Sequence, residues 1–488
     1  MFNLIDIFLK IVEAQPEHTA VAGPGNDEEL NYRQLAERID ALACELYDAG
    51  IRPGHCVGLH YPSGKNYIVI NYALWRCGAC VVPIPVEYVP DEKKRIFSDI
   101  CLNFVVSKVG IYSVVAPHCS ESPNRLSDDV VVASVESHKE HPPGFFEINP
   151  AFLRFTSGTT GASKGVLLSH ETIFERIHAA NDALRIGPDD RIIWLLSMSH
   201  HFAVSIVAYL SFGATIVLCR DHFGRTIIET TAMRSGTIIY GSPIHYELMA
   251  NDRSSLQLPS LRLAISTTTS LRNEVAESFH ARFGKSLSQA YGIIEIGLPC
   301  INIDAPQNKF GSVGRLLPAY EICMDDVGMG EELKAIRLRG KGVFDAYYCP
   351  WQTRNELLED GWFSTGDLGM LDEDGYLYIK GRMKEVVNIA GMKFFPQEVE
   401  QVLLSHPDVE DACVYSHKHE WRGEVPYARV VAKNGIKQQL AEKELKIYCS
   451  KFLSAYKVPD KILFVQILSR TASGKLIRDE ARMNVGKE

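Results

Sequence analysis

A run of glycine, hydroxyl and lysine residues, from Thr156 to Gly165, is the part of this sequence best suited to chemistry. It reads Thr-Ser-Gly-Thr-Thr-Gly-Ala-Ser-Lys-Gly. Glycines let a backbone turn its N–H groups toward an anion, while hydroxyls and an ammonium group add further donors and charge. A flexible surface loop would have a similar composition, but this segment also has the donors of a phosphate site. The residues expected to bind phosphate are Thr156, Ser157, Gly158, Thr159, Thr160, Gly161 and Lys164.

Apolar segments on both sides of this run favour the phosphate-binding interpretation. Residues 151–155 and 165–168 each predict a short strand, so the loop would be held between ordered elements. The common nucleotide loop needs Gly-x-x-x-x-Gly-Lys-Ser/Thr, whereas here Ser163 precedes Lys164 and Gly165 follows it. An ordinary P-loop kinase or GTPase is therefore disfavoured.

A second loop of the same residue types, Arg470-Thr-Ala-Ser-Gly-Lys475, lies near the C-terminus. Its lysine could bring positive charge to a phosphate already bound elsewhere. Two such loops on separate domains predict an active site that is completed when the domains close.

The composition is that of a large globular protein that handles small molecules. The chain has 488 residues, of which 46% are hydrophobic and 23% charged, and its length suggests roughly three average domains. Sixty acidic and 51 basic residues give a net charge of −9 without a dense basic run. Nothing therefore indicates nucleic acid or an anionic membrane as a partner. Twelve cysteines are scattered, and the single CxxC pair, Cys77 and Cys80, is more typical of packing than of a metal or redox site.

Two apolar stretches superficially resemble export or membrane segments. Residues 1–16 carry acidic and basic side chains among Leu4 and Phe8 and lack a small-residue cleavage site, which predicts an amphipathic surface helix. Residues 192–219 are interrupted by serines, histidines and a glycine, which favours a buried strand–helix–strand unit over a span. We therefore expect no membrane span and a cytoplasmic protein.

Strands alternate with helices along most of the chain. Residues 32–50 predict an amphipathic helix that ends at Gly50, and residues 56–60 and 80–84 predict strands around a helix at 66–76. This βαβ order is typical of sheets covered on both faces. The fold class is therefore expected to be α/β, with a large N-terminal domain of layered, mostly parallel sheets. Further strands are expected at 238–240, 263–265 and 288–291.

A domain boundary is predicted between residues 383 and 384. A polar turn at 372–375 and a predicted strand at 376–380 are followed by the connector Gly381-Arg-Met-Lys384, after which a new α/β pattern begins. This assigns residues 1–383 to the large domain and 384–488 to a small, mobile C-terminal α/β domain that carries the second loop.

Motifs along nearly the whole chain resemble those of the adenylate-forming superfamily, which includes acyl-CoA synthetases, aryl-CoA ligases, peptide-synthetase adenylation domains and luciferases. Besides the first loop, Tyr291-Gly-Ile-Ile-Glu295 is similar to the family's Tyr-Gly-x-Thr-Glu, and Ser364-Thr-Gly-Asp367 to its Thr-Gly-Asp. Gly381-Arg382 with Lys384 resembles the family's hinge, residues 391–400 the stretch after it, and Ser473-Gly-Lys475 its terminal lysine loop. One such motif would be a weak signal, whereas several in the same order are a strong one.

The resemblance implies an ATP-dependent acid–thiol ligase. Such an enzyme activates a carboxylic acid as acyl-AMP, releases pyrophosphate and transfers the acyl group to a thiol, most simply CoA, with ATP and Mg²⁺ as cofactors. The alternative is a stand-alone adenylation enzyme that loads the phosphopantetheine of an acyl or peptidyl carrier protein. A luciferase-like oxygenase or a nucleotide sensor is a remote alternative.

The resemblance also gives each motif a role in ATP binding or catalysis. Lys475 is expected to stabilise charge on the α-phosphate, and Glu295 with Thr156 to hold Mg²⁺. Asp367 would accept hydrogen bonds from the ribose and Arg382 would donate to ribose or phosphate, although an Asx-turn and a surface ion pair are the plain alternatives. The expected hinge is Lys384. The remaining ATP-binding residues would be Thr267, Thr268, Tyr291 and Gly292.

The resemblance to the adenylate-forming superfamily also implies an acyl pocket and a thiol site. His200 lies where relatives have a gate over the thiol tunnel, although a satisfied buried histidine is the alternative. Amino-acid-activating relatives have an aspartate next to this position, and here none occurs before Asp221. An aryl or short-to-medium acyl carboxylate is therefore favoured as substrate. The expected acyl-binding residues are His200, Phe202, Tyr240, His245, Tyr246, Thr268, Ile293, Gly297 and Leu298, and the expected CoA-binding residues are Lys393 and Arg422.

The chain departs from the family pattern at three places. Ile294 stands where a threonine normally helps to bind the α-phosphate or the metal, so that hydrogen bond would be missing or supplied elsewhere. Residues 267–270, Thr-Thr-Thr-Ser, replace a segment rich in glycine and alanine that ends in proline. Ser469 replaces a common proline before the second loop.

Overall fold

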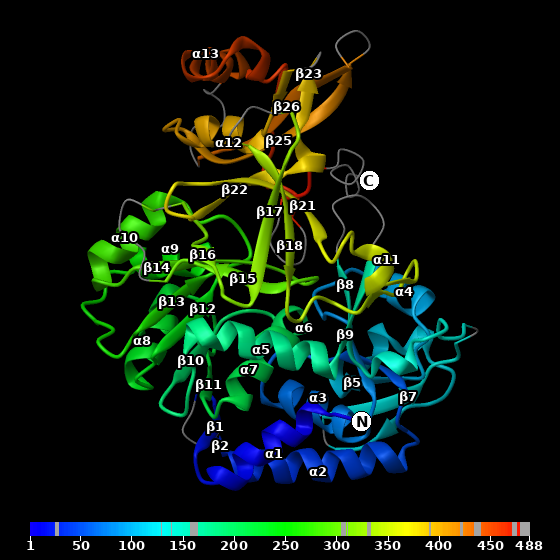
Figure 1. Cartoon of the computed structure of the whole chain (residues 1–488). Coiled ribbons are helices and arrows are strands. Elements are labelled where there is room, and N and C mark those ends of the chain that lie inside the picture. The colour runs from blue at the N-terminus through cyan, green and yellow to red at the C-terminus, as the bar shows by residue number, and fades with distance from the viewer. Residues whose placement is uncertain are drawn as a thin grey trace. The chain divides into compact units, whose positions relative to one another are not determined.

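A computed structural model shows two compact units (Figure 1). The first contains residues 1–156, 163–321 and 339–361, and the second contains residues 322–338 and 362–488. This grouping reflects packing and does not test a hinge, so the boundary between residues 383 and 384 remains a prediction. The structure describes residues 1–24, 29–127, 129–137, 139–156, 164–303, 309, 311–328, 333–389, 392–419, 423–433, 441–470 and 476–478.

The first unit contains a nine-stranded sheet with a parallel centre. Its ladders from β1 through β11, β10, β12 and β13 to β14 are parallel, while β2, β15 and β16 pair antiparallel at the edges. In order, the strands are β16 (Arg315–Leu316), β15 (Gly297–Ile301), β14 (Leu287–Ile293), β13 (Leu263–Ser266), β12 (Ile238–Gly241), β10 (Arg191–Trp194), β11 (Thr215–Leu218), β1 (Thr19–Ala22) and β2 (Leu30–Asn31).

A second nine-stranded sheet of the same unit carries the strands around the first loop. Strands β3, β4, β5 and β8 form its parallel part, and β8 pairs antiparallel with β9 across the loop. Strand β19 extends the antiparallel ladder from β9, although about 180 residues separate them in the sequence. In order, the strands are β20 (Gln352–Thr353), β19 (Ala346–Tyr347), β9 (Lys164–Ser169), β8 (Pro150–Thr156), β4 (Cys80–Pro83), β3 (Cys56–His60), β5 (Phe104–Lys108), β7 (Val130–Ser134) and β6 (Asn124–Arg125).

Helices cover both sheets and bury their apolar faces against the strands. Helices α8 (Gly224–Met233), α9 (Pro243–Asn251) and α10 (Asn273–Phe283) share one core with β10–β13 (Figure 1). Helix α5 (His170–Leu184) contacts β8 and β9 of one sheet and β15 of the other. The other helices of this unit are α1 (Leu4–Ala14), α2 (Tyr32–Asp48), α3 (Lys65–Arg76), α4 (Pro90–Asp99), α6 (Met198–His201), α7 (Ile206–Ser211) and α11 (Arg354–Leu357).

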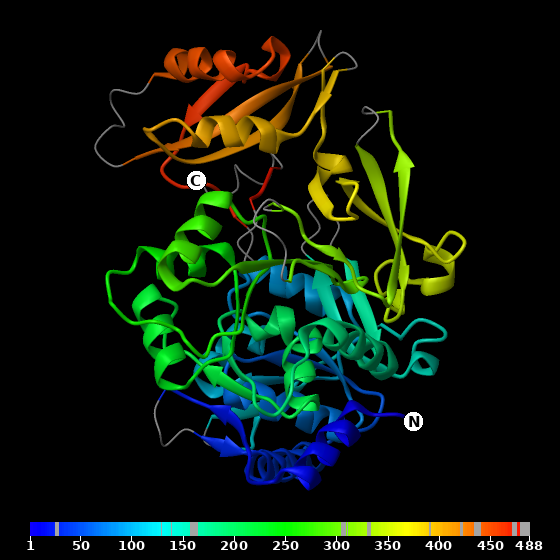
Figure 2. The same ribbon diagram turned by 60° about the vertical axis from the view of Figure 1, so that its left-hand side comes forward.

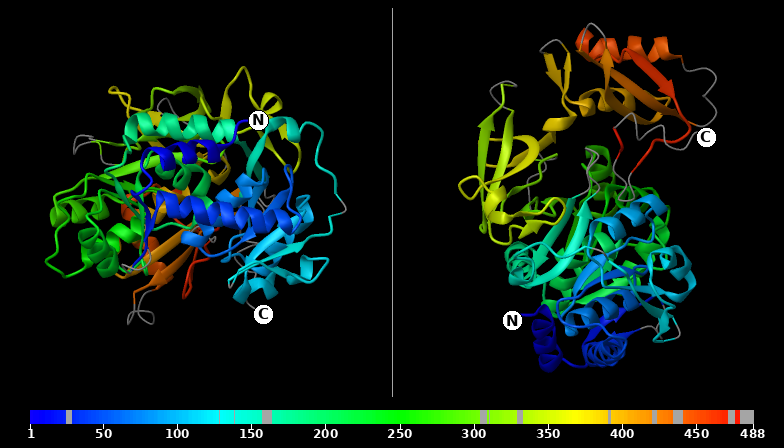
Figure 3. Two further views of the ribbon diagram at one scale, coloured as in Figure 1. Left: turned by 90° about the horizontal axis from the view of Figure 1, so that it is seen from below. Right: turned by 90° about the vertical axis from the view of Figure 1, so that its right-hand side faces the viewer.

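Helices α1 and α2 lie side by side at the start of the chain (Figure 3). Helix α2 begins with a capping box, in which Asn31 Oδ1 accepts from the Gln34 N–H and Gln34 Oε1 accepts from the Asn31 N–H. These bonds satisfy two of the free backbone donors of the first turn. Leu4 and Phe8 of α1 are buried, as its amphipathic pattern predicts.

The second unit contains a four-stranded sheet and a five-stranded sheet. The first has the order β17 (Tyr320–Asp326), β18 (Lys334–Gly340), β21 (Phe363–Leu371) and β22 (Leu377–Arg382). Helices α12 (Pro396–Leu404) and α13 (Glu442–Phe452) pack on each other beside the five-stranded sheet (Figure 2). The strands of that sheet are β24 (Met392–Phe394), β23 (Val387–Ile389), β26 (Gly423–Ala432) and β25 (Val409–His419), with β27 (Lys461–Phe464) paired to β26.

The predicted α/β class and the layered architecture are confirmed. Parallel ladders occupy the centre of the first sheet, whereas antiparallel pairs outnumber parallel ones in the second. Residues 192–219 form β10, α6, α7 and β11, as expected for a buried strand–helix–strand unit. Among the helices of the described residues, none has both the length and the apolar character that a bilayer crossing requires.

Candidate active site

The β8–β9 hairpin places both ends of the first loop. Thr156 ends β8 and is paired with Lys164, which begins β9. The Lys164 ammonium lies over the ring of Tyr347, 4.1 Å from its centroid, so the lysine is held at the sheet surface by a cation–π contact. The predicted phosphate-binding residues Ser157, Gly158, Thr159, Thr160 and Gly161 lie outside the described residues.

The β14–β15 hairpin carries the second motif. Tyr291 is buried and pairs with Cys300, and Ile293 pairs with Gly297. A Cβ added to Gly292 would lie 2.6 Å from the carbonyl oxygen of Gly297, which real side chains do not tolerate. Gly292 is therefore required where β14 approaches the Gly297 carbonyl group. Leu298 follows on β15 and is half-buried.

Glu295 projects from the turn of this hairpin, and both its carboxylate and its backbone are fixed. Tyr347 donates its hydroxyl proton to Glu295 Oε1 at 3.0 Å. Arg176 of α5 donates to the carbonyl oxygens of Ile294 at 2.7 Å and Glu295 at 2.9 Å, and also to that of Gly342. Burial lowers the pKa of Arg176 to about 10, which leaves its guanidinium charged at neutral pH.

The backbone around Ile294 is thus supported without the family's threonine. Ile294 is half-buried, and the bond from Arg176 reaches its carbonyl rather than its side chain. Arg176 could not be predicted to support this backbone, because it lies 118 residues before Ile294 in the sequence and on another element.

His200 lies on α6 beside an acidic residue. Its Nε2 is 3.5 Å from Glu87 Oε1, and the same oxygen accepts a hydrogen bond from the Ser197 hydroxyl at 2.9 Å. Burial alone would raise the pKa of Glu87, but the nearby His200 and hydrogen bonds from its own backbone and Ser197 outweigh that effect and lower it. Glu87 is therefore ionised, and the Tyr88 ring packs 5.8 Å from that of His200.

Arg154, in the middle of β8, was not identified from the sequence. Its Nη1 donates to the carbonyl oxygen of His200, and Glu295 and Tyr88 lie near enough to influence its charge. The sequence feature that could have identified Arg154 is that it is a single arginine in an otherwise apolar strand directly before the first loop. An arginine rarely occupies such a position without a partner or a function.

Thr267 and Thr268 directly follow β13. The Thr267 N–H donates to the carbonyl oxygen of Gly241 at 3.0 Å. Thr268 has a φ of +79°, in the left-handed region that β-branched residues rarely adopt. The conformation suits glycine, which the family pattern has in this segment, so the substitution keeps the backbone shape at the cost of strain.

The residues expected around the acyl group lie in different environments. Tyr240 stacks on Trp194 with ring centroids 5.6 Å apart, and burial raises its pKa. Phe202 is fully buried, and its ring packs against those of Tyr67, Tyr72 and Trp75. The role of Phe202 in acyl binding remains a prediction.

Two further residues of this set belong to α9. Tyr246 is fully buried, and its hydroxyl donates to the carbonyl oxygens of Ile239 at 3.0 Å and Ile265 at 2.6 Å. The His245 ring caps the first turn of α9, because its Nδ1 lies 3.1 Å from the Ser242 N–H. Burial lowers the pKa of His245 to about 4, so the ring is neutral and can accept this bond. The acyl-binding role of both residues remains a prediction.

The second unit holds the Thr-Gly-Asp motif and the hinge motif on neighbouring strands. Asp367 of β21 pairs with Arg382 of β22, and Arg382 Nε lies 2.8 Å from Asp367 Oδ1. Asp367 is 3% exposed, whereas the Arg382 side chain is 43% exposed. The arginine therefore orients a buried carboxylate and keeps part of its own fork accessible.

Lys384, the expected hinge, is exposed in the short helix Met383–Glu385 directly after β22. Lys393 is exposed on β24, opposite Asn388 of β23. Lys475 and Arg422, the expected catalytic and CoA-binding residues, lie outside the described residues.

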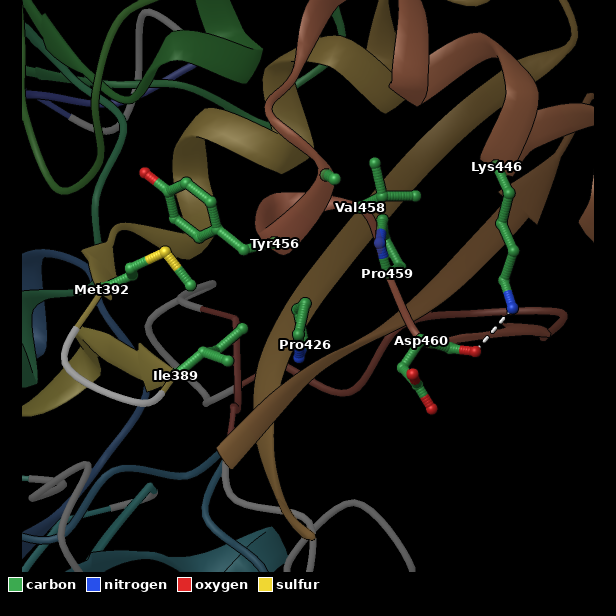
Figure 4. A pocket seen from close by; sticks show the side chains of 9 residues that line it. Ile389, Met392, Pro426, Lys446, Tyr456, Val458, Pro459 and Asp460 are labelled. Atoms are coloured by element: carbon green, nitrogen blue, oxygen red, sulfur yellow. Dashed lines mark hydrogen bonds between the residues drawn. The ribbon is translucent and has the colours of Figure 1, made fainter. Parts of the chain in front are cut away.

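A hollow of about 500 Å³ opens on the second unit (Figure 4). One wall is apolar and the other ends at Lys446, whose ammonium donates to the carbonyl oxygen of Asp460. Met392, the neighbour of Lys393, belongs to the apolar wall. The residues that line it are Ile389, Met392, Pro426, Lys446, Ala455, Tyr456, Val458, Pro459 and Asp460.

Comparison with known protein families covers most of the chain. A model described as AMP-binding enzyme matches residues 8–348, and one described as AMP-binding enzyme C-terminal domain matches residues 398–475. The sulfoacetate–CoA ligase of Cupriavidus necator is 27% identical, over 98% of this chain and 97% of that protein. The indoleacetate–CoA ligase of Aromatoleum aromaticum is 28% identical, over 97% of this chain and 96% of that protein.

Solved structures have the same fold. ATP-bound MatB from Rhodopseudomonas palustris superposes with a TM-score of 0.84 at 25% identity, over 99% of this chain and 98% of that one. The two family models match successive parts of the chain. The chain belongs to the AMP-binding enzymes of the adenylate-forming superfamily and is an AMP-forming ligase of the acyl-CoA synthetase type.

Proposed function

We propose that the protein joins a small carboxylic acid to CoA in two steps at the expense of ATP. In the first, a carboxylate oxygen attacks the α-phosphorus of ATP, the bond to pyrophosphate breaks and acyl-AMP forms. In the second, the sulfur of CoA attacks the acyl carbon, AMP leaves with the bonding electrons and the thiol proton passes to solvent or a base. The observation that carries the proposal is the doubly anchored Glu295, held by Tyr347 and Arg176 next to the strands of the first loop.

Glu295 is suited to hold Mg²⁺ in the first step. That ion binds through one or two carboxylates together with phosphate oxygens, and the Tyr347 bond to Oε1 fixes the orientation of this carboxylate. Bound there, Mg²⁺ would neutralise charge on the triphosphate. Thr156, at the end of β8, is the proposed second ligand.

The remaining roles belong to the same proposal. The first loop and Lys164 would bind phosphates, Thr267, Thr268, Tyr291 and Gly292 the adenine side, and Asp367 with Arg382 the ribose. Lys475 would stabilise charge on the α-phosphate during adenylation. Lys393 and Arg422 would bind the CoA phosphate.

The acceptor, the location and the acid are also proposed. Support for CoA comes from the relatives, which are named as CoA ligases. A cytoplasmic location agrees with cysteines that are all free in the structure. The acids in the names of relatives, among them sulfoacetate, indoleacetate and oxalate, define the first panel to test, next to aryl and short-to-medium acyl carboxylates.

The test is ATP-dependent pyrophosphate release across this panel, followed by thioester formation with CoA or a holo carrier protein. We expect release with one class of acid and at least a tenfold preference for CoA, which corresponds to about 1.4 kcal/mol. A tenfold preference for the carrier protein would instead identify a loading enzyme. ATP binding without release for any acid would contradict the proposed function.

Lys475→Ala tests the catalytic charge. We expect loss of about 3–4 kcal/mol of transition-state stabilisation in adenylation, while ATP still binds. Lys443→Ala, which removes an exposed lysine of α13, is the matched control. Near-normal ATP–pyrophosphate exchange by Lys475→Ala would contradict the role.

A further inference from the structure

Arg154 occupies a position where a positive charge lowers the stability of the fold unless it is compensated. Its strand neighbours Leu153 and Phe155 belong to an apolar core of the first unit, and successive side chains of a strand point to opposite faces. Arg154 therefore faces away from that core. The residue is half-buried.

Arg154 forms no ion pair with a carboxylate of the described residues. Its one hydrogen bond to them runs from Nη1 to the carbonyl oxygen of His200. Its Nε is buried and has no hydrogen-bond partner. Burial accordingly lowers the pKa of Arg154, with only partial compensation from Tyr88 and Glu295. A cation with a buried donor that lacks a partner costs stability unless an anion completes its surroundings.

The position of Arg154 in the sheet shows which parts of the proposed site lie on either side of its guanidinium group. Arg154 pairs with Val166 of β9, and Val166 pairs with Tyr347 of β19. Directly opposed residues share a face of the sheet, so Arg154 lies on the same side as Tyr347, which holds Glu295 at 3.0 Å. On its other side, Arg154 contacts the backbone of His200. The guanidinium therefore lies between the proposed metal-binding carboxylate and the proposed acyl gate.

We propose that Arg154 binds the carboxylate of the incoming acid and aims it for attack. The inference rests on the proposed function, because it places the reacting carboxylate between the Glu295 side and the His200 side. A guanidinium fork suits a carboxylate, whose two oxygens accept parallel N–H bonds. The same contact neutralises the negative charge that would otherwise oppose approach to a triphosphate.

Arg154 is thus a positioning residue for the first step alone. Once acyl-AMP has formed, the free carboxylate no longer exists, and the fork has no anion of that kind to hold. The second step should therefore be insensitive to Arg154. A purely structural arginine that anchors the His200 carbonyl would affect both steps, because His200 borders the same site.

The experiment measures the two half-reactions separately in the full-length enzyme. Arg154→Met should raise the KM for the acid by about tenfold or more, since a charge-assisted bidentate contact is lost, and leave the KM for ATP nearly unchanged. Thioester formation from CoA and synthetic acyl-AMP should stay close to the wild-type rate. Arg154→Lys should recover part of the loss, because it restores the charge without the fork.

Other outcomes would overturn the inference. An unchanged KM for the acid in Arg154→Met, or an equal loss in both half-reactions, would assign Arg154 a structural role. If Arg154→Met does not fold, the same comparison is made with Arg154→Lys, for which an unchanged KM for the acid or an equal loss in both steps has the same meaning. Arg33→Met, which removes an exposed arginine of α2 paired with Glu17, is the control for loss of a positive charge.

Failure of this inference differs from failure of the proposed function. If the wild-type enzyme releases pyrophosphate with no acid, the proposed function fails. If the wild type is active and Arg154→Met behaves like it, only the assignment of Arg154 fails.

Discussion

Arg176 shows how a buried side chain can support a reactive group that it does not touch. Its guanidinium binds the carbonyl oxygens of Ile294 and Glu295, and so fixes the turn from which the Glu295 carboxylate projects. The motif around Tyr291 predicted Glu295 because its residue types lie together in the sequence. Arg176 and Arg154 carry no comparable signal, since their partners are backbone carbonyls from distant segments. Local patterns therefore predict the residues of a site better than the residues that hold them.

His170, at the start of α5, makes the stability of the first unit depend on pH. It is 3% exposed, and its Nδ1 accepts from the Leu4 N–H at 3.2 Å, which requires a neutral ring. Burial lowers its pKa to about 3, against about 6.5 in an unfolded chain. Below about pH 6.5 the histidine is protonated in the unfolded chain but still neutral in the folded protein. The free energy of unfolding therefore falls as the pH falls.

When the pH is lowered from 7.5 to 5.5, we expect protonation of His170 in the unfolded chain to reduce the free energy of unfolding by about 1.4 kcal/mol. Urea unfolding at the two pH values should show a smaller change for His170→Asn, which keeps an acceptor but does not titrate. The same pH dependence in wild type and variant would show that His170 is protonated as easily in the folded state as in the unfolded one.

Secondary structure was predicted closely where the pattern is local. The strand expected at residues 56–60 is β3 (Cys56–His60), and the helix expected at 66–76 is α3 (Lys65–Arg76). The two-residue strand β19 was not predicted, because no alternation can be read from Ala346 and Tyr347 alone. Its place beside β9 depends on the fold of the intervening chain, although its Tyr347 is part of the site.

The β14–β15 hairpin should not tolerate a side chain at residue 292. Gly292→Ala would place a Cβ 2.6 Å from the Gly297 carbonyl oxygen, and relief of that clash must move the turn that carries Glu295. We expect a loss of about 1–3 kcal/mol in stability, together with a marked drop in pyrophosphate release. Gly187→Ala, where a Cβ would meet nothing within 4 Å, is the control. Wild-type adenylation by Gly292→Ala would show that the hairpin relaxes freely.

A buried ionic cluster joins the C-terminal segment to α12 and to the hinge region. Arg478 lies 2.9 Å from Glu400 of α12 and 3.2 Å from Glu385, the residue after Lys384. Glu400 also accepts from the Val414 N–H at 2.8 Å. Loss of the arginine would leave two largely buried carboxylates without their cation.

Arg478→Met should therefore destabilise the second unit by about 3–5 kcal/mol, as expected when one partner of a buried ion pair is removed. Thermal unfolding should show that the added change Glu400→Gln recovers part of the loss. Arg470→Met, which breaks a more exposed pair with Asp411, should have a smaller effect. Equal effects of Arg478→Met and Arg470→Met would contradict the importance of burial.

At the scale of the whole molecule, we expect Lys384 to allow one enzyme to carry out two steps. Proline fixes φ and restricts the residue before it, so Lys384→Pro should hinder rotation of the backbone at the proposed hinge. ATP–pyrophosphate exchange should persist, whereas thioester formation should fall by about tenfold or more. Lys384→Ala, which keeps the rotation, is the control. An equal loss of both steps in Lys384→Pro would place the hinge elsewhere.

The path of the chain between the two units also determines where the genes of two related enzymes can be recombined to give a folded hybrid. The polypeptide leaves the first unit after residue 321, returns at 339 and leaves again after 361, and the ladder between β18 and β21 joins the two excursions. A crossover between two parent genes near residue 361 would give β18 and β21 to different ancestors and break the match of their facing side chains. A crossover near residue 384 would keep all four strands of that sheet from one parent. In the apolar cluster beside it, Phe395 and Val386 would still have to fit Leu368 across the joint. Natural or laboratory shuffling should therefore yield active hybrids far more often at the second point than at the first.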